Sequence, residues 1–237
     1  MPGKIYTKTG DDGTTGLLFG GRAPKDSLQI EANGAVDEAQ SFLGLVRADL
    51  PSKSELQRLL VAVETDLWVL MAEVATAPEN RHKLKGGQTK VTEEMVRSLE
   101  QQIDDFTSRS TIPLQFVVPG ENPVSARLDV ARTVVRRAER LVVTLHLGEE
   151  SQAGPYLNRL SDLVWTLARW CEGDHRTLAG KERRPRKQLG TSNKAGPGKK
   201  ASPAKKASAD TKASAVKKSR AAKNEIPTKK KAKGEGS

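Results

Sequence analysis

Residues 28–48, LQIEANGAVDEAQSFLGLVRA, decide the fold, because their apolar side chains return every three or four residues. The stripe consists of Leu28, Ala32, Val36, Ala39, Leu43 and Val46. At about 100° per residue these side chains share one face of an α-helix, and a helix with one apolar face must bury it against partners. Pro51 then ends the segment. We therefore predict a helix over 28–48 that packs against further helices.

Four more segments have apolar residues at the same spacing of three or four residues. Thr92 and Asn122 are good residues to cap a helix N-terminus, Pro123 suits a first helical position, and Gly154-Pro155 opens the last segment. The four segments are residues 54–76, 92–106, 122–146 and 156–172. Almost nothing predicts a strand. Five helices of this length with short connections predict an all-α protein, a five-helix up-and-down bundle.

Two connections between these helices differ from a simple short turn. Residues 79–90 are polar and contain Gly86-Gly87, so they predict a mobile loop. Residues 116–120, FVVPG, are too short for a helix and predict an extended segment that ends in a turn.

The composition changes near residue 181. Residues 181–237 contain 19 Lys or Arg and four acidic residues, a net charge of +15. The whole chain carries +11, so residues 1–180 carry −4. A segment of Ala, Lys, Ser, Pro and Gly cannot bury enough apolar surface to offset its ordering entropy. We predict a bundle domain over 1–180 and a disordered basic tail over 181–237.

The remaining composition excludes several classes of protein. The single cysteine, Cys171, rules out an internal disulfide and, within an apolar helical pattern, is more typical of a core thiol than of a nucleophile. His82, His146 and His175 match no metal-ligand spacing. No apolar run is long enough to span a bilayer, and no signal-peptide pattern begins the chain. These features predict a cytoplasmic protein that does not enter the membrane.

The segment before the first helix, KIYTKTGDDGTTGLLFGGR over residues 4–22, has a different chemistry. Gly10, Gly13 and Gly16 recur every three residues among hydroxyls, and Lys8 and Lys25 flank them. Glycine lets backbone N–H groups approach an anion closely, and lysine supplies point charge for phosphate. The pattern is neither a Walker A loop nor G-x-G-x-x-G. It predicts a polyphosphate cradle, and an ordinary surface turn stays open as the alternative.

A row of arginines follows on the fourth predicted helix. Arg132, Arg136 and Arg140 recur every four residues and form one stripe beside the apolar face. Three like charges in a row repel one another unless an anion or carboxylates neutralise them. A solvated basic face is the plain alternative. Carboxylates and amides on other helices offer partners: Asp37, Glu38, Asn158 and Asp162.

With these motifs in place, residues 4–172 resemble the PduO-type ATP:cob(I)alamin adenosyltransferases. Five blocks carry the resemblance in the family's order: YTKTGDDG from Tyr6, EANGAVDE from Glu31, FVVPG from Phe116, ARTVVRRAER from Ala131 and YLNRLSD from Tyr156. The resemblance implies a five-helix bundle that assembles as a homotrimer, with active sites between neighbouring subunits. The tail over residues 181–237 lies outside the part of the chain that shows the resemblance.

The resemblance also implies roles for individual residues. ATP would lie on the glycine loop, with Lys25 reaching the phosphates, on the arginine run and on an amide of the last helix: Thr7, Lys8, Thr9, Gly10, Thr15, Gly16, Lys25, Arg136, Arg137, Ala138, Glu139, Arg140 and Asn158. Asp37 would form a salt bridge with Arg132 near the corrin. Phe116 would press on the lower face of the cobalt. The residues of the chemical step would be Asp37, Phe116, Arg132 and Arg136.

The implied reaction is attack by Co(I) of cob(I)alamin on the 5′ carbon of ATP, with triphosphate leaving. Mg²⁺ and the cations of the site would stabilise the leaving group, and a cobalamin reductase would supply Co(I). Two other functions stay open from the residues. The basic tail favours non-specific binding of nucleic acid or another polyanion, with the bundle as a scaffold. An ATP-binding regulator that has lost the transfer reaction is the third hypothesis.

Overall fold

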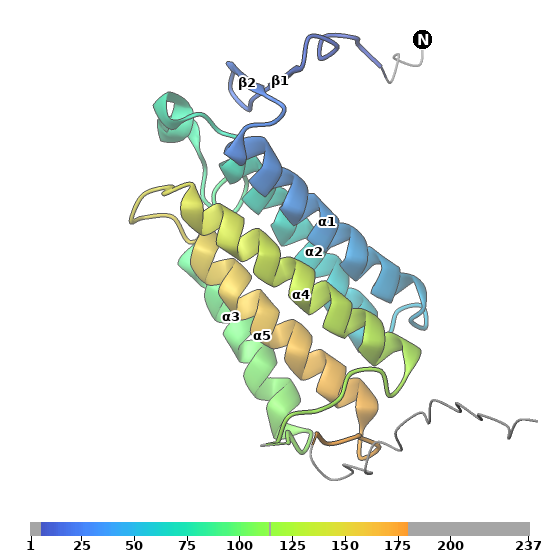
Figure 1. Ribbon diagram of the computed structural model, residues 1–237. Coiled ribbons are helices and arrows are strands. Elements are labelled where there is room, and N and C mark those ends of the chain that lie inside the picture. Colours follow the sequence, from blue (N-terminus) through green and yellow to red (C-terminus); the bar gives the residue numbers. More distant parts are fainter. Residues whose placement is uncertain (1–5, 114, 180–237) are drawn as a thin grey trace, which may run out of the picture. The chain divides into compact units, whose positions relative to one another are not determined.

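Five helices form the body of the protein in the computed structural model, which describes residues 6–113 and 115–179 (Figure 1). They are α1 (Leu28–Ala48), α2 (Glu55–Val74), α3 (Glu93–Ser108), α4 (Pro123–Thr144) and α5 (Ala153–Glu172). The all-α bundle is confirmed, and α1 has the predicted bounds. The tail over 181–237 lies outside the described residues, so its disorder and the boundary at residue 180 stay predictions.

The helix starts follow from the capping residues. The Thr92 hydroxyl accepts a hydrogen bond from the Met95 N–H at 3.4 Å, as the sequence predicts for α3. Asn122 and Ser125 form a capping box, in which each side chain accepts from the other residue's N–H, at 2.9 and 3.3 Å. These contacts satisfy N–H groups that have no partner within the helix. The chain therefore enters α4 at a fixed point, directly after the FVVPG segment.

Three local features differ from the sequence expectations. Strands β1 (Thr14–Gly16) and β2 (Arg22–Pro24) form a short antiparallel hairpin within the glycine-rich segment. A 3₁₀-helix, η1 (Pro78–Lys83), occupies part of the connection predicted to be a loop, because Pro78 pre-sets its first turn. Helix α5 begins at Ala153 rather than after Pro155, since a proline in the first turn gives up no intrahelical hydrogen bond.

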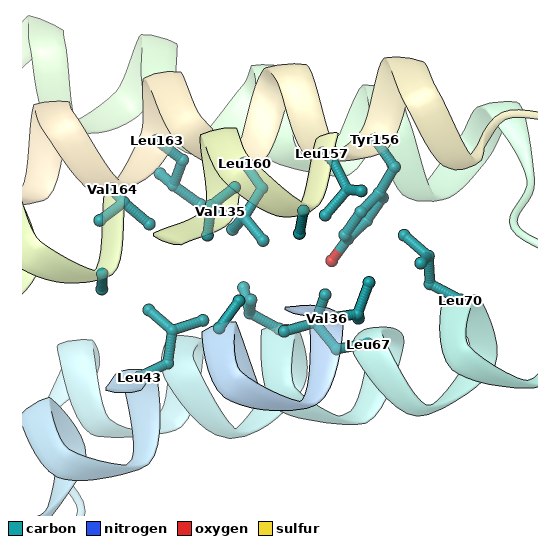
Figure 2. Close-up of a cluster of buried hydrophobic side chains, with 14 of the residues drawn as sticks. Val36, Leu43, Leu67, Leu70, Val135, Tyr156, Leu157, Leu160, Leu163 and Val164 are labelled. Atoms are coloured by element: carbon teal, nitrogen blue, oxygen red, sulfur yellow. The ribbon is translucent and has the colours of Figure 1, made fainter. Parts of the chain in front are cut away.

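The core lies between all five helices. Helix α1 packs on α2 and α4, α4 packs on α5, and α5 packs on α3. Figure 2 shows side chains of α1, α2, α4 and α5 meeting in one apolar cluster: Val36, Leu43, Leu67, Leu70, Val135, Tyr156, Leu157, Leu160, Leu163 and Val164. The hydroxyl of Tyr156 donates to Asp66 at 3.1 Å, so the one polar atom of this cluster is satisfied.

Helices α1 and α4 are antiparallel, which fixes the two ends of the bundle. Arg127 at the start of α4 pairs with Asp49 just after α1, and Arg137 further along pairs with Glu38. The hairpin precedes the start of α1, while the 109–122 connection precedes the start of α4, at the other end (Figure 1). A helix of 21 residues, such as α1, is about 30 Å long. Within the described residues, no helix is long and apolar enough to cross a bilayer.

Candidate functional site

The hairpin holds a lysine against a glycine. The Lys25 N–H donates to the Gly13 carbonyl at 2.9 Å, and Gly13 has a φ of +82°, a conformation that favours glycine. A Cβ atom on Gly10 would lie 3.2 Å from the Lys25 Nζ and 3.1 Å from the Thr14 carbonyl oxygen. Only a residue without a side chain therefore lets the ammonium lie this close to the loop backbone. The structure thus brings together Gly10 and Lys25, as a phosphate cradle requires.

Side chains of the hairpin hold its remaining turns. Asp12 accepts hydrogen bonds from the Thr14 N–H and hydroxyl at 2.9 and 2.8 Å, and these bonds lower the pKa of its carboxyl. Arg22 donates to the Thr14 hydroxyl at 2.8 Å and to the Thr9 carbonyl at 2.5 Å. The predicted loop residues share this one unit: Thr7, Lys8 and Thr9 precede β1, and Thr15 and Gly16 lie in it.

A groove of about 470 Å³ connects the hairpin to the helices. Lys25 contributes from the hairpin, Glu31, Gly34 and Glu38 from α1, and Arg137 from α4. Arg137 forms an ion pair with Glu38 across the groove. Two predicted site residues from distant parts of the sequence, Lys25 and Arg137, therefore line one concave surface.

The arginine run on α4 is largely exposed, with Arg132 half-buried. Arg136 and Arg140 are exposed, and the Arg140 guanidinium donates to the Arg136 carbonyl at 2.9 Å. The Arg136 side chain makes no hydrogen bond or ion pair with another described residue. Glu139 accepts from the Asn158 amide at 2.9 Å, which joins two further predicted residues. Ala138 is fully buried, so its side chain packs in the core and does not face solvent.

Phe116 lies at the other end of the bundle, on the rim of a second pocket. Its side chain is 88% exposed, an unusual state for a phenylalanine, and the pocket has a volume of about 620 Å³. The lining comes from the 109–122 connection, α4 and α5: Ile112, Pro113, Gln115, Phe116, Val117, Pro119, Asp129, Arg132, Trp165 and Arg169. Large apolar surface beside two guanidinium groups suits a flat organic ligand that also carries polar groups.

A buried ion cluster lies on the helix side of this pocket. Arg169 is 2% exposed and donates to Asp129 at 2.5 Å and to Glu172 at 2.9 Å. Arg132 Nε lies 3.6 Å from Asp129 Oδ1. Burial raises the pKa of the Glu172 carboxyl, and Arg169 opposes that rise. Asp129 therefore connects Arg132 to the buried cluster by an ion pair.

The predicted salt bridge between Asp37 and Arg132 does not form within the chain. Arg132 lies beside Asp129, three residues earlier on α4, and Asp37 is exposed on α1. The Arg137–Glu38 and Arg127–Asp49 pairs show why. In this antiparallel register Asp37 lies opposite the residues next to Arg137, more than a helical turn from Arg132 along the axis.

Two arginines at and near the second pocket escaped the sequence analysis: Arg169 lines the pocket, and Arg176 lies behind it in the ion cluster. Arg169 and Arg176 surround Glu172, and Arg176 donates to the Arg169 carbonyl at 3.0 Å. Arg169 stands directly after Leu167 and Ala168 in the apolar stripe of α5, and a charge within such a stripe is the signal that could have revealed it. Cys171, by contrast, behaves as predicted for a core thiol. Burial raises its pKa to about 11, which disfavours the nucleophilic thiolate.

The fold and these two sites define a class: a helical bundle with a glycine-rich hairpin at one end and an apolar pocket at the other. The family model for cobalamin adenosyltransferase matches residues 5–171. A corrinoid adenosyltransferase of Citrobacter freundii is 42% identical over 170 residues, which cover 70% of this chain and 93% of that protein. One from Bacillus subtilis is 41% identical over 171 residues, 70% of this chain and 85% of its own.

A solved structure agrees with these sequence relatives. It is a variant of a PduO-type ATP:corrinoid adenosyltransferase from Lactobacillus reuteri, complexed with cobalamin and ATP. It matches with a TM-score of 0.62 and 32% identity, over 71% of this chain and 93% of that chain. The chain therefore belongs to the cobalamin adenosyltransferase family.

Proposed function

We propose that this protein is an ATP:corrinoid adenosyltransferase, which transfers the 5′-deoxyadenosyl group of ATP to cob(I)alamin and releases triphosphate. The observation that carries the proposal is the hairpin, in which the Lys25 ammonium lies against Gly10 beside a groove that reaches Arg137. Such an arrangement suits a polyphosphate, and the family match over residues 5–171 supplies the reaction. The competing hypothesis for the same site is an ATP-binding regulator that has lost the transfer reaction.

The cations would act on the leaving group. When the 5′ carbon is attacked, negative charge builds up on the departing triphosphate, and donors that are already in place stabilise it. Lys8, Lys25, Arg136 and Arg140 are the candidates, with the backbone N–H groups around Gly10. Cob(I)alamin is itself the nucleophile, so no residue has to remove a proton. This explains why a site without a histidine base suits the reaction.

Mg²⁺ belongs to the proposal as part of the ATP complex. The ion is usually held by phosphate oxygens, water and one or two carboxylates. Glu31 and Glu38 line the groove beside Lys25, so carboxylates are present where the phosphates would lie. The ion would neutralise part of the charge that develops on triphosphate.

Phe116 would receive the corrin. An exposed phenyl ring on the rim of an apolar pocket can cover the lower face of a corrin and exclude a water or base ligand from the cobalt. Loss of that ligand makes reduction to Co(I) easier. Arg132, which pairs with Asp129 of the buried cluster, would lie beside the corrin.

Assembly as a homotrimer would join the two half-sites. Within one chain the hairpin and Phe116 lie at opposite ends of the bundle, and α1 alone spans about 30 Å. A neighbouring subunit could place its Phe116 pocket beside the hairpin of this one. The exposed Asp37 would then be free to meet Arg132 across the interface. Measurement of the molar mass in solution tests this part, and a monomer that is fully active would contradict it.

The tail is the basis of a second candidate function, binding of nucleic acid or another polyanion. Its net charge of +15 favours contacts with phosphate backbones without sequence preference. This binding is compatible with the enzyme activity, because the family match ends at residue 171. A cobalamin reductase is the protein partner that the chemistry requires. We place both activities in the cytoplasm, as the single cysteine favours a reducing compartment.

Purified protein with ATP, Mg²⁺ and chemically reduced cobalamin tests the enzyme function, through the visible spectrum of adenosylcobalamin. Arg136→Ala should lower kcat by about 10²–10³-fold, as loss of one preorganised donor to a developing charge does. Arg97→Ala is the matched control, because Arg97 is an exposed helical arginine on α3 that pairs with Glu93. Equal activity of the two variants would show that the arginine run is only a solvated face.

A further inference from the structure

The residues that follow α5 are tied to the loop that carries Phe116. We call residues 174–179 the strap and residues 111–121 the pocket loop. The Val118 N–H donates to the Thr177 carbonyl, and the Ala179 N–H donates to the Phe116 carbonyl, each at 2.8 Å. Val117 and Leu178 face each other in an antiparallel bridge between these bonds. The strap therefore runs as a short strand beside Phe116.

Two side chains of the strap extend this attachment to both ends of the pocket loop. The Arg176 guanidinium donates to the Thr111 carbonyl at the start of the loop. The Thr177 hydroxyl lies 3.3 Å from Glu121 Oε2, to which it donates, at the end of the loop. The strap thus contacts the pocket loop at its beginning, middle and end.

The pocket loop has few other attachments. Within the described part of the chain, every hydrogen bond between the pocket loop and a residue outside it comes from the strap. Phe116 itself is 88% exposed, so packing of its side chain does little to hold it. A loop that few contacts restrain samples many conformations, and the bonds it does make decide its position.

The strap is in turn anchored to the buried ion cluster. Arg176 donates to the Arg169 carbonyl at 3.0 Å and lies 3.9 Å from Glu172. Arg169 and Glu172 are both buried, and Arg169 also pairs with Asp129. Asp129 in turn lies beside Arg132. One continuous chain of contacts therefore runs from the strap to Arg132, which lines the same pocket as Phe116.

We infer that the strap is a positioning element of the corrin site. It holds the Phe116 side chain at a fixed position relative to the pocket, and it connects the pocket loop to Arg132. The inference rests on the proposed function and adds residues to it, because the family model ends at residue 171 and does not include the strap. Phe116 has to meet the cobalt face closely to exclude a ligand. A displacement of about 1 Å at a reacting centre can cost 10²-fold in rate.

Two truncations separate the strap from the tail. A protein of residues 1–180 keeps the strap and lacks the tail, whereas a protein of residues 1–173 lacks both. In full-length protein, Ala179→Pro removes the N–H that donates to Phe116. Leu178→Pro is its matched control, since the Leu178 N–H makes no hydrogen bond to another described residue and the preceding Thr177 lies in extended chain.

We expect 1–180 to match the full-length protein. We expect 1–173 and Ala179→Pro to lower kcat about tenfold or more, with KM for ATP within about twofold, because the strap forms hydrogen bonds with the pocket loop and the end of α5, and none with the hairpin among the described residues. The electron paramagnetic resonance spectrum of bound cob(II)alamin should show less of the form without a lower ligand. Hydrogen exchange should accelerate in peptides over 111–121 and stay unchanged in α1 and α2.

The outcomes are distinct. If 1–180 and the full-length protein form no adenosylcobalamin, the proposed function fails, whereas the exchange data still report on the strap. If 1–180 is active and 1–173 and Ala179→Pro equal it in kcat and in spectrum, the positioning role is refuted. An equal loss in Leu178→Pro and Ala179→Pro would also refute it, because only one of them removes the hydrogen bond to Phe116.

Discussion

Gly10 shows how the lack of a side chain shapes the hairpin that we propose as the ATP site. Its place in a run of glycines and hydroxyls predicts a cradle, and the structure adds the reason that this glycine matters. A Cβ atom on Gly10 would lie only 3.2 Å from the Lys25 Nζ, closer than an ordinary van der Waals contact. The sequence places Lys25 in the neighbourhood, but the hairpin that brings it back to Gly10 has strands of only three residues, too short for a pattern.

Gly10→Ala should therefore weaken ATP binding. The new methyl group would push the Lys25 ammonium or the Thr14 carbonyl away by a few tenths of an ångström, so KM for ATP should rise several-fold while the melting temperature changes little. Gly44→Ala is the control, because its Cβ would meet Glu64 at an ordinary 3.5 Å and lies in the interior of α1. That substitution should stabilise the helix by about 0.5–1 kcal/mol. An unchanged KM in Gly10→Ala would remove Lys25 from the phosphate site.

Phe116→Ala should act on cobalt chemistry rather than on ATP. Without the ring, a water or base ligand can stay on the lower face of the cobalt, so formation of Co(I) should slow while the affinity for ATP stays the same. Trp68→Ala is the control, since Trp68 is another aromatic residue with 65% of its surface exposed. Isothermal titration with ATP and the rate of Co(II) reduction are the two measurements. A large loss of ATP affinity would contradict the assigned role.

At the level of elements, the helices were predictable and the connections were not. The apolar stripe of α1 and the caps at Thr92 and Asn122 are local signals, and local signals set where a helix begins. The strap was not predictable, because residues 174–179 have no periodicity and the bonds that join them to the pocket loop are to residues some sixty positions away. The Asp37–Arg132 pair was expected from resemblance, and a nearer carboxylate, Asp129, takes its place within the chain.

The end of α5 depends on Arg169. Arg169→Ala would leave the carboxylates of Asp129 and Glu172 buried without their shared partner, which typically costs about 3–5 kcal/mol. Arg159→Ala on the same helix removes an exposed arginine that pairs with Glu100 and Asp162, and should cost less than about 1 kcal/mol. Chemical denaturation of both variants makes the comparison. Equal losses of stability would show that the buried cluster does not support the helix.

At the scale of the whole molecule, the charge is divided between two parts. Residues 1–180 carry −4 and residues 181–237 carry +15, so the high isoelectric point comes from the tail alone. Truncation after Gly180 should leave adenosyl transfer and assembly intact and remove most of the affinity for DNA or RNA. Binding by the full-length protein should weaken steeply with salt, as counterion release requires. Gel shifts at low and high salt measure this. No binding at low salt would leave the tail without the proposed role.

A trimer would multiply that effect. Three tails on one particle raise the effective concentration of each once another is bound, so the avidity for a long polyanion can exceed that of a free tail peptide by about 10²–10⁴-fold. The same assembly would bring a hairpin from one subunit to the Phe116 pocket of the next. Assembly would therefore link the two proposals, because a partner subunit would complete the active site and would also raise the avidity of the tail.

The fate of the three phosphates tests the central claim most directly. Displacement at the 5′ carbon releases triphosphate intact, whereas ordinary ATP hydrolysis releases phosphate or diphosphate. Purified protein should convert ATP and cob(I)alamin to adenosylcobalamin with one triphosphate formed for each adenosyl group transferred, both measured in the same sample by chromatography. ATP that is bound without forming adenosylcobalamin, or that is cleaved to phosphate or diphosphate in place of triphosphate, would contradict the account.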